Sequence, residues 1–320
     1  MWIFGKLKRY FNQNTYKIIA TIAICIFVIF VIQILNFMAK SSNEKNNAET
    51  PVANNIQSQT QKPELSSPIT DTTISENTGK TNEELIKEFI NTCNNGDIET
   101  AYNLLGTDCK NELYPNITDF QKNYFNTIFQ SKKIVTTEFW DSKESTYTYK
   151  VRILEDALST GKYQAENIAE DFYTIISENS EKKLNINGFI SKKEIKKSTD
   201  SNGIQIEVKN KYMYKEYEKY DISIRNNTNK TISAIDLAQS SNTIYITDEN
   251  GTTYSAYMNE IIPEKLIVKP DQIQNFSIKY NKLYNTQKQT KTVNFSQIIL
   301  DYETYINGGE SQTTGITINL

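Results

Sequence analysis

The chain has 320 residues and a formal net charge of −3, and it contains no histidine. The missing imidazole excludes Ser-His-Asp triads, Cys-His pairs, HExxH zinc sites and histidine pH switches. The three cysteines are too few for a Cys₄ zinc or iron–sulfur site, so the sequence predicts no metal and no cofactor. The near-neutral charge also predicts no nucleic-acid partner.

The first strong local signal is an apolar run, Ile18–Ala39, that contains no charged residue. A helix needs about 20 apolar residues to cross a bilayer, and cleaved signal peptides have shorter apolar regions. The run therefore predicts a single-pass transmembrane helix in the lipid bilayer. Cys25 follows Ile24 rather than a small residue, so we interpret it as an apolar residue of this helix and not as a lipidation site.

The charges that flank this run predict its orientation. Residues 1–17 are basic, and the positive-inside rule places them in the cytoplasm, with the rest of the chain extracytoplasmic at the cell membrane. Residues 40–80 lack aromatic side chains and hold three of the six prolines. Such a segment buries too little apolar surface to offset its ordering entropy, which predicts a disordered linker.

Residues 81–191 predict a first globular domain that begins with helices. Thr81–Glu84 is a capping box, and apolar residues recur on one helical face after it. Asn94–Asp97 breaks this helix and caps a second one, and a capping box at Thr118–Gln121 opens a third.

The spacing of the apolar residues then changes from the helical period of 3.6 to the alternation typical of strands. Four strands are predicted, at residues 134–140, 145–154, 172–177 and 184–190. Helices followed by an antiparallel sheet indicate an α+β domain.

The stretch Phe89–Leu105, FINTCNNGDIETAYNLL, resembles the opening of the nuclear transport factor-like (cystatin-like) superfamily, in which a Gly-Asp turn joins two helices. The stretch Leu184–Ile190 resembles the last strand of that fold. The resemblance implies a cone in which three helices pack on a curved antiparallel sheet. Its pocket serves hydrolases, isomerases, ligand binders and scaffolds, so the fold does not give the function.

Three aromatic residues are the candidate lining of a ligand pocket in this cone: Trp140, Tyr147 and Tyr149. The alternative is that these rings simply fill the core, which is the commoner use of buried aromatics. Catalytic members of the superfamily often use a histidine–aspartate or tyrosine–aspartate arrangement. With histidine absent, we assign no catalytic residue and expect no enzyme.

Cys93 and Cys109 are expected to be two reduced thiols. Cys109 follows a predicted helix that carries the chain roughly 12 Å away from Cys93, whereas a disulfide needs Cα atoms within about 7 Å. A disulfide remains the alternative if the chain returns sharply after Gly106.

Residues 192–202 predict a polar connector that carries a cluster of lysines. A solvated hinge is favoured over adhesion to an anionic polymer or lipid headgroup. Residues 203–320 then contain short alternating runs, with an Asn250-Gly251 hairpin signal, which predict an antiparallel β-sandwich resembling immunoglobulin-like modules. Asp248, Glu249 and Asn250 lack the spacing of a calcium loop.

The run Lys211–Tyr220 mixes tyrosines with charges. Its tyrosines do not all share one strand face, so a bend followed by a strand is favoured over a partner-binding edge.

Together these features predict a non-enzymatic, membrane-anchored extracytoplasmic scaffold or assembly subunit of a bacterial cell-envelope machine. The layout is similar to single-span subunits of conjugation or type IV secretion systems, and its expected partners are envelope proteins or further copies of itself. One alternative is a tethered ligand-binding or sensing protein that uses the cone pocket. A wall-acting enzyme is the other, but no carboxylate pair can be placed for it.

Overall fold

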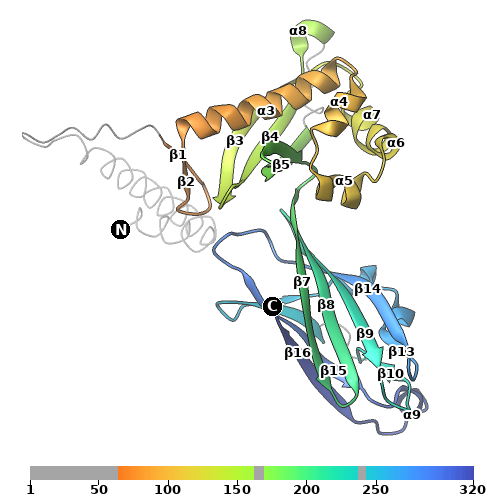
Figure 1. Cartoon of the computed structure of the whole chain (residues 1–320). Coiled ribbons are helices and arrows are strands. Elements are labelled where there is room, and N and C mark those ends of the chain that lie inside the picture. Colours follow the sequence, from red (N-terminus) through yellow and green to blue (C-terminus); the bar gives the residue numbers. More distant parts are fainter. Residues whose placement is uncertain (1–63, 162–168, 237–242) are drawn as a thin grey trace, which may run out of the picture. The chain divides into compact units, whose positions relative to one another are not determined.

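A computed structural model describes residues 64–161, 169–236 and 243–320 (Figure 1). The predicted cytoplasmic segment, the predicted span Ile18–Ala39 and the linker up to residue 63 lie outside these described residues.

The described chain begins with a hairpin, β1 (Glu64–Ser66) and β2 (Thr73–Ser75), inside the predicted linker. The linker prediction is therefore wrong for this stretch. Leu65 and Ile74 pack on the core of the helical region, and this burial offsets the ordering cost that the polar composition suggested. Gly79 lets the hairpin approach closely, because a Cβ there would lie 2.3 Å from Leu65.

The long helix α3 (Glu76–Asn94) begins earlier than its predicted capping box. Ser75 is the N-cap, and its side chain accepts an N–H from Thr78 at 3.2 Å. Thr81 instead lies inside the helix, where its hydroxyl donates to the carbonyl of Asn77. One face of α3 buries apolar residues, including Ile86 and Phe89.

Several short helices take the place of the predicted second and third helices. They are α4 (Ile98–Asn103), α5 (Thr107–Leu113), α6 (Ile117–Phe120), the π-helix η1 (Gln121–Phe125) and α7 (Asn126–Ile128). Asp97 caps α4 as expected, but Asn116 rather than Thr118 caps α6.

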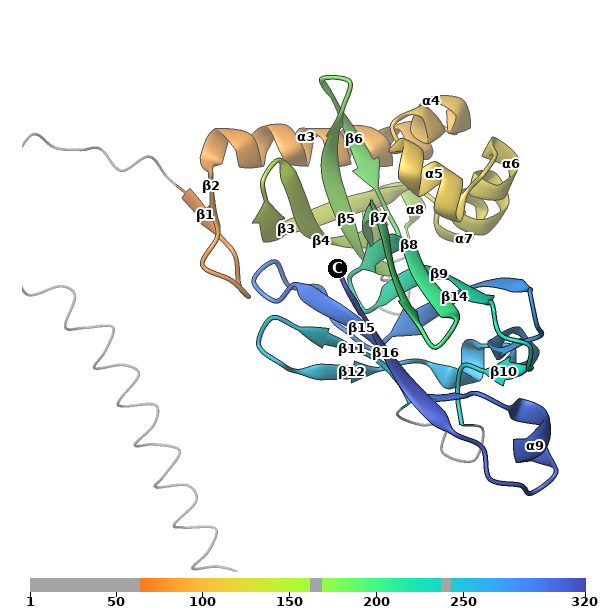
Figure 2. The same cartoon turned by 60° about the horizontal axis from the view of Figure 1, so that its bottom comes forward.

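The helices pack against an antiparallel sheet in the order β3–β4–β5–β6 (Figure 2). Its strands are β3 (Lys133–Lys143), β4 (Thr146–Glu155), β5 (Ala169–Glu178) and β6 (Glu181–Asn185), and the short helix α8 (Ala157–Thr160) follows β4. In the register, Tyr149 lies opposite Phe139 on one side and Tyr173 on the other. A bulge between Phe139 and Asp141 leaves Trp140 without an opposite residue in the β3–β4 register.

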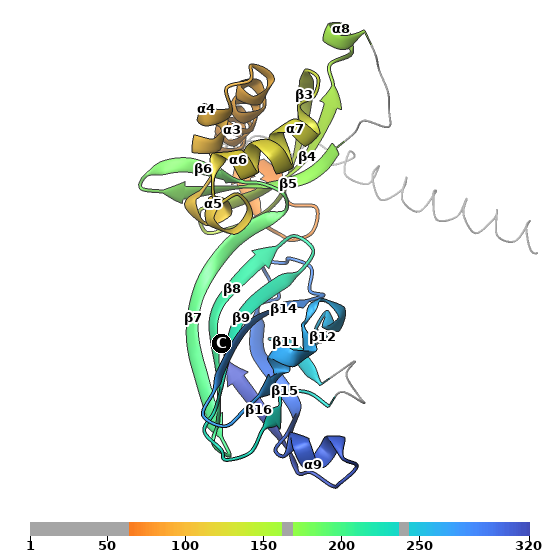
Figure 3. The same ribbon diagram turned by 90° about the vertical axis from the view of Figure 1, so that its right-hand side faces the viewer.

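The predicted strand 184–190 is divided by a turn at Asn187 and Gly188, which both have positive φ. After the turn, β7 (Phe189–Ser201) runs straight through the predicted connector 192–202 (Figure 3). The connector's lysines are therefore strand residues. Strand pairing with β8 (Ile204–Tyr214) satisfies their backbone, which a sequence rich in lysine does not reveal.

Two sheets enclose the second core. The first has the order β14–β9–β8–β7 and adds β9 (Glu218–Asn226) and β14 (Ile273–Tyr280). The second has the order β12–β11–β15–β10–β13, with β16 paired to β15. Its strands are β10 (Ile232–Ser233), β11 (Ile244–Asp248), β12 (Thr253–Ser255), β13 (Ile267–Val268), β15 (Thr290–Ile299) and β16 (Thr313–Asn319). Short helices η3 (Met258–Glu260), η4 (Pro263–Leu266) and α9 (Tyr302–Ile306) connect them.

The predicted fold class, a transmembrane helix, then a cone of three helices on a sheet, then a β-sandwich, is wrong. The described residues are mostly strand, with one long helix and several short ones. Tyr212 and Tyr214 of β8 pack into the helical region's core, and all the described residues fall in one compact unit.

Among the described residues, no helix is long and apolar enough to cross a membrane. The longest of them, α3, carries charged residues around its buried face. This finding contradicts the prediction of a single-pass cell-membrane protein with an extracytoplasmic bulk.

Candidate functional site

The structure separates the three residues that the sequence proposed as a pocket. Tyr147 and Tyr149 lie on the face of β4 that packs against the helical core, and Tyr149 is fully buried and bonded to the Asn82 amide at 3.2 Å. Trp140 lies at the bulge of β3, where its ring meets that of Phe172 at 5.2 Å. The three side chains therefore do not converge on one site.

Aromatic rings fill the interior between the helices and the sheet. Phe89 meets Tyr173 edge-on with 5.8 Å between ring centres, and Phe120 stacks on Tyr124 at 5.6 Å. The hydroxyls of Tyr124 and Tyr173 hydrogen-bond to each other. Burial holds the pKa of both phenols well above the usual range. Such paired, neutral phenols behave as packing groups, and the interior is a core.

Cys93 and Cys109 are free thiols in this core, as expected from the sequence. Burial raises the pKa of each thiol to about 12. Since the thiolate is the reactive form, neither cysteine is suited to act as a nucleophile or metal ligand near neutral pH.

An open groove of about 410 Å³ lies where the start of β5, the turn before β7 and the β8–β9 turn meet. This volume is in the range of small-ligand sites. We call it the aromatic groove. Its lining is Glu170, Asp171, Phe172, Asn187, Gly188, Tyr214, Lys215, Glu216 and Tyr217.

Asp171 forms the inner wall of the aromatic groove. Its carboxylate accepts backbone N–H groups from Phe172 at 2.6 Å and from Asn187 at 2.9 Å. Burial raises the pKa of Asp171 to about 6, and the backbone donors act in the opposite direction. A carboxyl that titrates near neutrality makes the charge of this wall dependent on pH.

Three aromatic side chains and one lysine also line the groove. The Lys215 ammonium lies 4.9 Å from the ring centres of both Trp140 and Phe172. Tyr214 and Tyr217 stack at 4.3 Å, and Lys279 covers Tyr217 at 4.9 Å. Amphipathic rings held in this way give rigid contact area with little entropy to lose on binding.

The half-buried Glu112 braces one wall of the groove, and the buried Asp141 follows Trp140 in β3. Glu112 of α5 accepts from the Tyr214 hydroxyl at 2.8 Å and from the Lys219 ammonium. Asp141 accepts three threonine hydroxyls, from Thr70, Thr72 and Thr286, at 2.8–3.0 Å. These bonds tie together segments that are far apart in the sequence.

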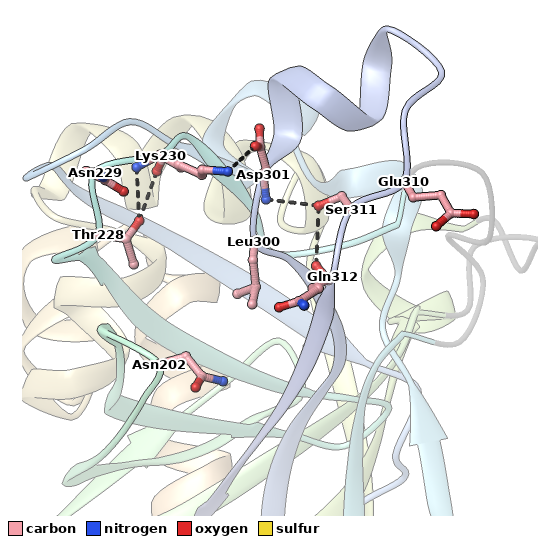
Figure 4. Close-up of a pocket in the computed structure, with 9 residues that line it drawn as sticks. All are labelled: Asn202, Thr228, Asn229, Lys230, Leu300, Asp301, Glu310, Ser311 and Gln312. Atoms are coloured by element: carbon pink, nitrogen blue, oxygen red, sulfur yellow. Dashed lines mark hydrogen bonds and ion pairs between the residues drawn. The ribbon is translucent and has the colours of Figure 1, made fainter.

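A second cavity, of about 330 Å³, lies between the loop that joins β9 to β10 and the two segments that flank α9 (Figure 4). Several of its polar groups are already bonded to one another. Lys230 pairs with Asp301 at 2.5 Å, and the Asp301 N–H donates to the Ser311 hydroxyl at 3.0 Å. Because these groups are satisfied, this cavity offers little chemistry to a ligand.

A third cavity, of about 300 Å³, differs in charge and is called the lysine cavity below. Its lining is Lys143, Glu144, Thr146, Ile190, Ser191, Lys192, Lys193, Met213, Tyr284 and Gln289.

Within residues 64–161, 169–236 and 243–320, no group of three or more acidic or cysteine side chains is placed to hold a metal ion. Glu170 is engaged by Lys150 at 2.8 Å and Arg152 at 3.1 Å, so it is not available as a partner for Asp171.

The sequence singled out part of the aromatic groove. The run Lys211–Tyr220 contains Tyr214, Lys215 and Tyr217, and the structure resolves it into the end of β8, a turn and the start of β9. Asp171 was missed. An Asp next to an aromatic residue is a common pattern in strands that face solvent, so the sequence does not mark Asp171. Only the turn at Asn187 brings a further backbone N–H to its carboxylate.

No family model and no curated protein match the chain. Among solved structures, a conserved hypothetical protein from Bacillus anthracis is 12% identical, with a TM-score of 0.25, and the match covers 38% of this chain and 95% of that chain. A similarity at this level carries no argument about fold or function.

Proposed function

We propose that this chain is a non-enzymatic protein-binding module, an assembly subunit whose contact surface is the aromatic groove. The groove is the observation that carries the proposal. It presents Phe172, Lys215 and Tyr217, and the ring of Tyr217 stacks on the buried Tyr214. Interface hot spots are rich in tyrosine and tryptophan, and they depend on such preorganised anchors.

The brace at Glu112 supports the same proposal. This half-buried carboxylate accepts from Tyr214 and from Lys219, so it fixes one wall of the groove before a partner arrives. A wall that does not have to be ordered on binding loses less conformational entropy.

Two other functions receive less support. A sensor that uses the cone interior needs a cavity there, but the interior holds packed rings such as Phe89, Tyr149 and Tyr173. A hydrolase of wall glycans needs two carboxyl groups facing one cleft. In the aromatic groove Glu170, the neighbour of Asp171 in the chain, is instead engaged by Lys150 and Arg152.

Site-specific photo-crosslinking in the native host tests the proposal. A photoreactive residue replaces Glu216, which is exposed at the groove, and in a matched strain it replaces Glu264, which is exposed on η4 outside the groove. We expect a discrete crosslinked partner from position 216 and not from position 264. Purification and mass spectrometry identify the partner.

The charge reversal Lys215→Glu gives the second arm. It removes the cation held over Trp140 and Phe172, and we expect the crosslink at position 216 to fall at least about tenfold. Equal crosslinking from both positions, or an unchanged crosslink in the Lys215→Glu protein, contradicts the proposed role of the groove.

A further inference from the structure

The lysine cavity lies between the β3–β4 turn, β7 and the loop before β15. Lys143, Glu144 and Thr146 come from the turn, Ser191 and Lys193 come from β7, and Tyr284 and Gln289 come from the loop. Ile190 and Met213 supply apolar surface. A recess of about 300 Å³ is at the lower end of the small-ligand range, enough for one compact group.

The lining carries an excess of positive charge. Three lysines against the one glutamate give a lining charge of +2. Within the part of the chain that the structure describes, no ion pair engages Lys143, Lys192 or Lys193.

The sheet behind the cavity adds to this field. Lys193 lies directly opposite Lys211 in the β7–β8 register, and like charges in that position destabilise a sheet. Lys211 is 5% exposed, and Lys193 contributes to lowering its pKa, although burial is the larger cause.

Lys211 belongs to a buried ionic triad. Glu218 accepts from Lys211 and from Lys282, each at 2.9 Å, and also from the hydroxyls of Tyr220 and Thr290. One carboxylate thus faces two buried ammonium groups. The triad keeps a net charge of +1 beside Lys193.

We propose that the lysine cavity binds the phosphate group of a small phosphate ester. A phosphate monoester carries about −1.5 to −2 charges near neutral pH, which matches the lining charge. Lysine ammonium groups bind phosphate as point charges, and the hydroxyls of Thr146 and Ser191 add neutral donors. The anion also screens the repulsion between Lys193 and Lys211.

Neighbouring groups identify which lysines matter most. The Lys192 ammonium lies 5.5 Å from the centre of the Tyr212 ring and interacts with Asp108, so it is partly engaged elsewhere. Lys143 and Lys193 are therefore the principal ligands. Glu144 repels ligands that carry more negative charge than a phosphate ester.

Isothermal titration calorimetry of the full-length protein with glycerol 3-phosphate tests the site, with potassium chloride at equal ionic strength as the salt control. We expect Lys193→Met and Lys143→Met each to weaken binding about tenfold, because each removes a charged donor. The matched control is Lys197→Met, on the same strand, exposed and outside the cavity lining; its affinity should stay within about twofold.

A parallel titration with inorganic phosphate distinguishes the sources of the group. Tighter binding of the ester supports a phosphorylated metabolite as the ligand, and tighter binding of the free ion supports phosphate itself. The proposal is overturned if neither binds above the chloride control, or if Lys197→Met loses as much affinity as Lys193→Met. It does not depend on the aromatic groove, so either proposal can fail alone.

Discussion

The two cores of the molecule are built from different side chains. The core beneath the helices is rich in aromatic rings, and its tyrosine hydroxyls bond to one another, to the Asn82 amide or to carboxylates such as Glu112. The core between the two sheets is rich in isoleucine, and it contains the Lys211–Glu218–Lys282 triad at its edge.

The two regions also differ in how their buried charges are matched. In the first region the buried Lys133 pairs with one carboxylate, Glu155, at 3.4 Å, whereas beside the second core two buried ammonium groups share the carboxylate of Glu218. One-to-one pairing leaves no net charge, and a shared carboxylate leaves a net positive charge. The candidate binding surfaces are lined by other residues.

The largest expected effect comes from the triad. Glu218→Gln leaves Lys211 and Lys282 buried without a counter-charge, which should cost about 3–5 kcal/mol of unfolding free energy. Chemical denaturation measures it, with Glu264→Gln as an exposed control expected to change stability by less than about 0.5 kcal/mol. A loss below about 1 kcal/mol would show that the triad is solvated.

Asp171 gives the next effect, through pH. Its folded pKa of about 6 exceeds the ordinary value of 3.8, so between these values the folded state holds the proton that the unfolded state has lost. Stability should therefore fall as pH rises from about 4 to 6, by about 3 kcal/mol in total from this group. Below pH 4 the group contributes nothing, because both states are protonated.

Denaturation of the wild type and of Asp171→Asn across this pH range isolates the contribution. We expect the variant to gain stability relative to the wild type as pH rises, whatever its offset at pH 4. A difference that is independent of pH would mean that Asp171 has an ordinary pKa.

A smaller effect is expected at the brace of the aromatic groove. Tyr214→Phe removes the hydroxyl that donates to Glu112 at 2.8 Å and should cost about 1 kcal/mol. Glu112 keeps the Lys219 ammonium as a partner, so it is not left unpaired. Thermal unfolding measures the change, and the crosslink from position 216 should weaken with it if the brace organises the groove.

The smallest effect has the opposite sign. Lys193→Met removes the like-charge pair with Lys211, so it should stabilise the ligand-free protein by about 0.2–1 kcal/mol. Added phosphate should stabilise the wild type more than this variant. Destabilisation by Lys193→Met without ligand would indicate that the lysine stem is needed for packing.

Local sequence patterns predicted the positions of several elements. The alternation around Tyr149 predicted β4 closely, and Asn94–Asp97 predicted the break between α3 and α4. These predictions succeed because strand alternation and helix caps depend on neighbours in the sequence. The resemblance to the nuclear transport factor-like superfamily remains a prediction.

Long-range contacts decided what the sequence predicted wrongly. The hairpin at 64–75 is polar in composition, but Asp141 supplies partners for Thr70 and Thr72 from far along the chain. The lysine-rich stretch after Phe189 is a strand because β8 pairs with it. Asp141 and β8 both lie too far along the chain to be recognised from the residues next to the hairpin or to the lysine-rich stretch.

The sequence by itself determined the excluded chemistries, through the missing histidine, and the aromatic run that contributes to the groove. Only the tertiary structure decided that Asp171 meets this run, and that Lys193 lies opposite Lys211. Composition and local period are properties of the chain, whereas the field at a site depends on which charges pairing and burial bring together.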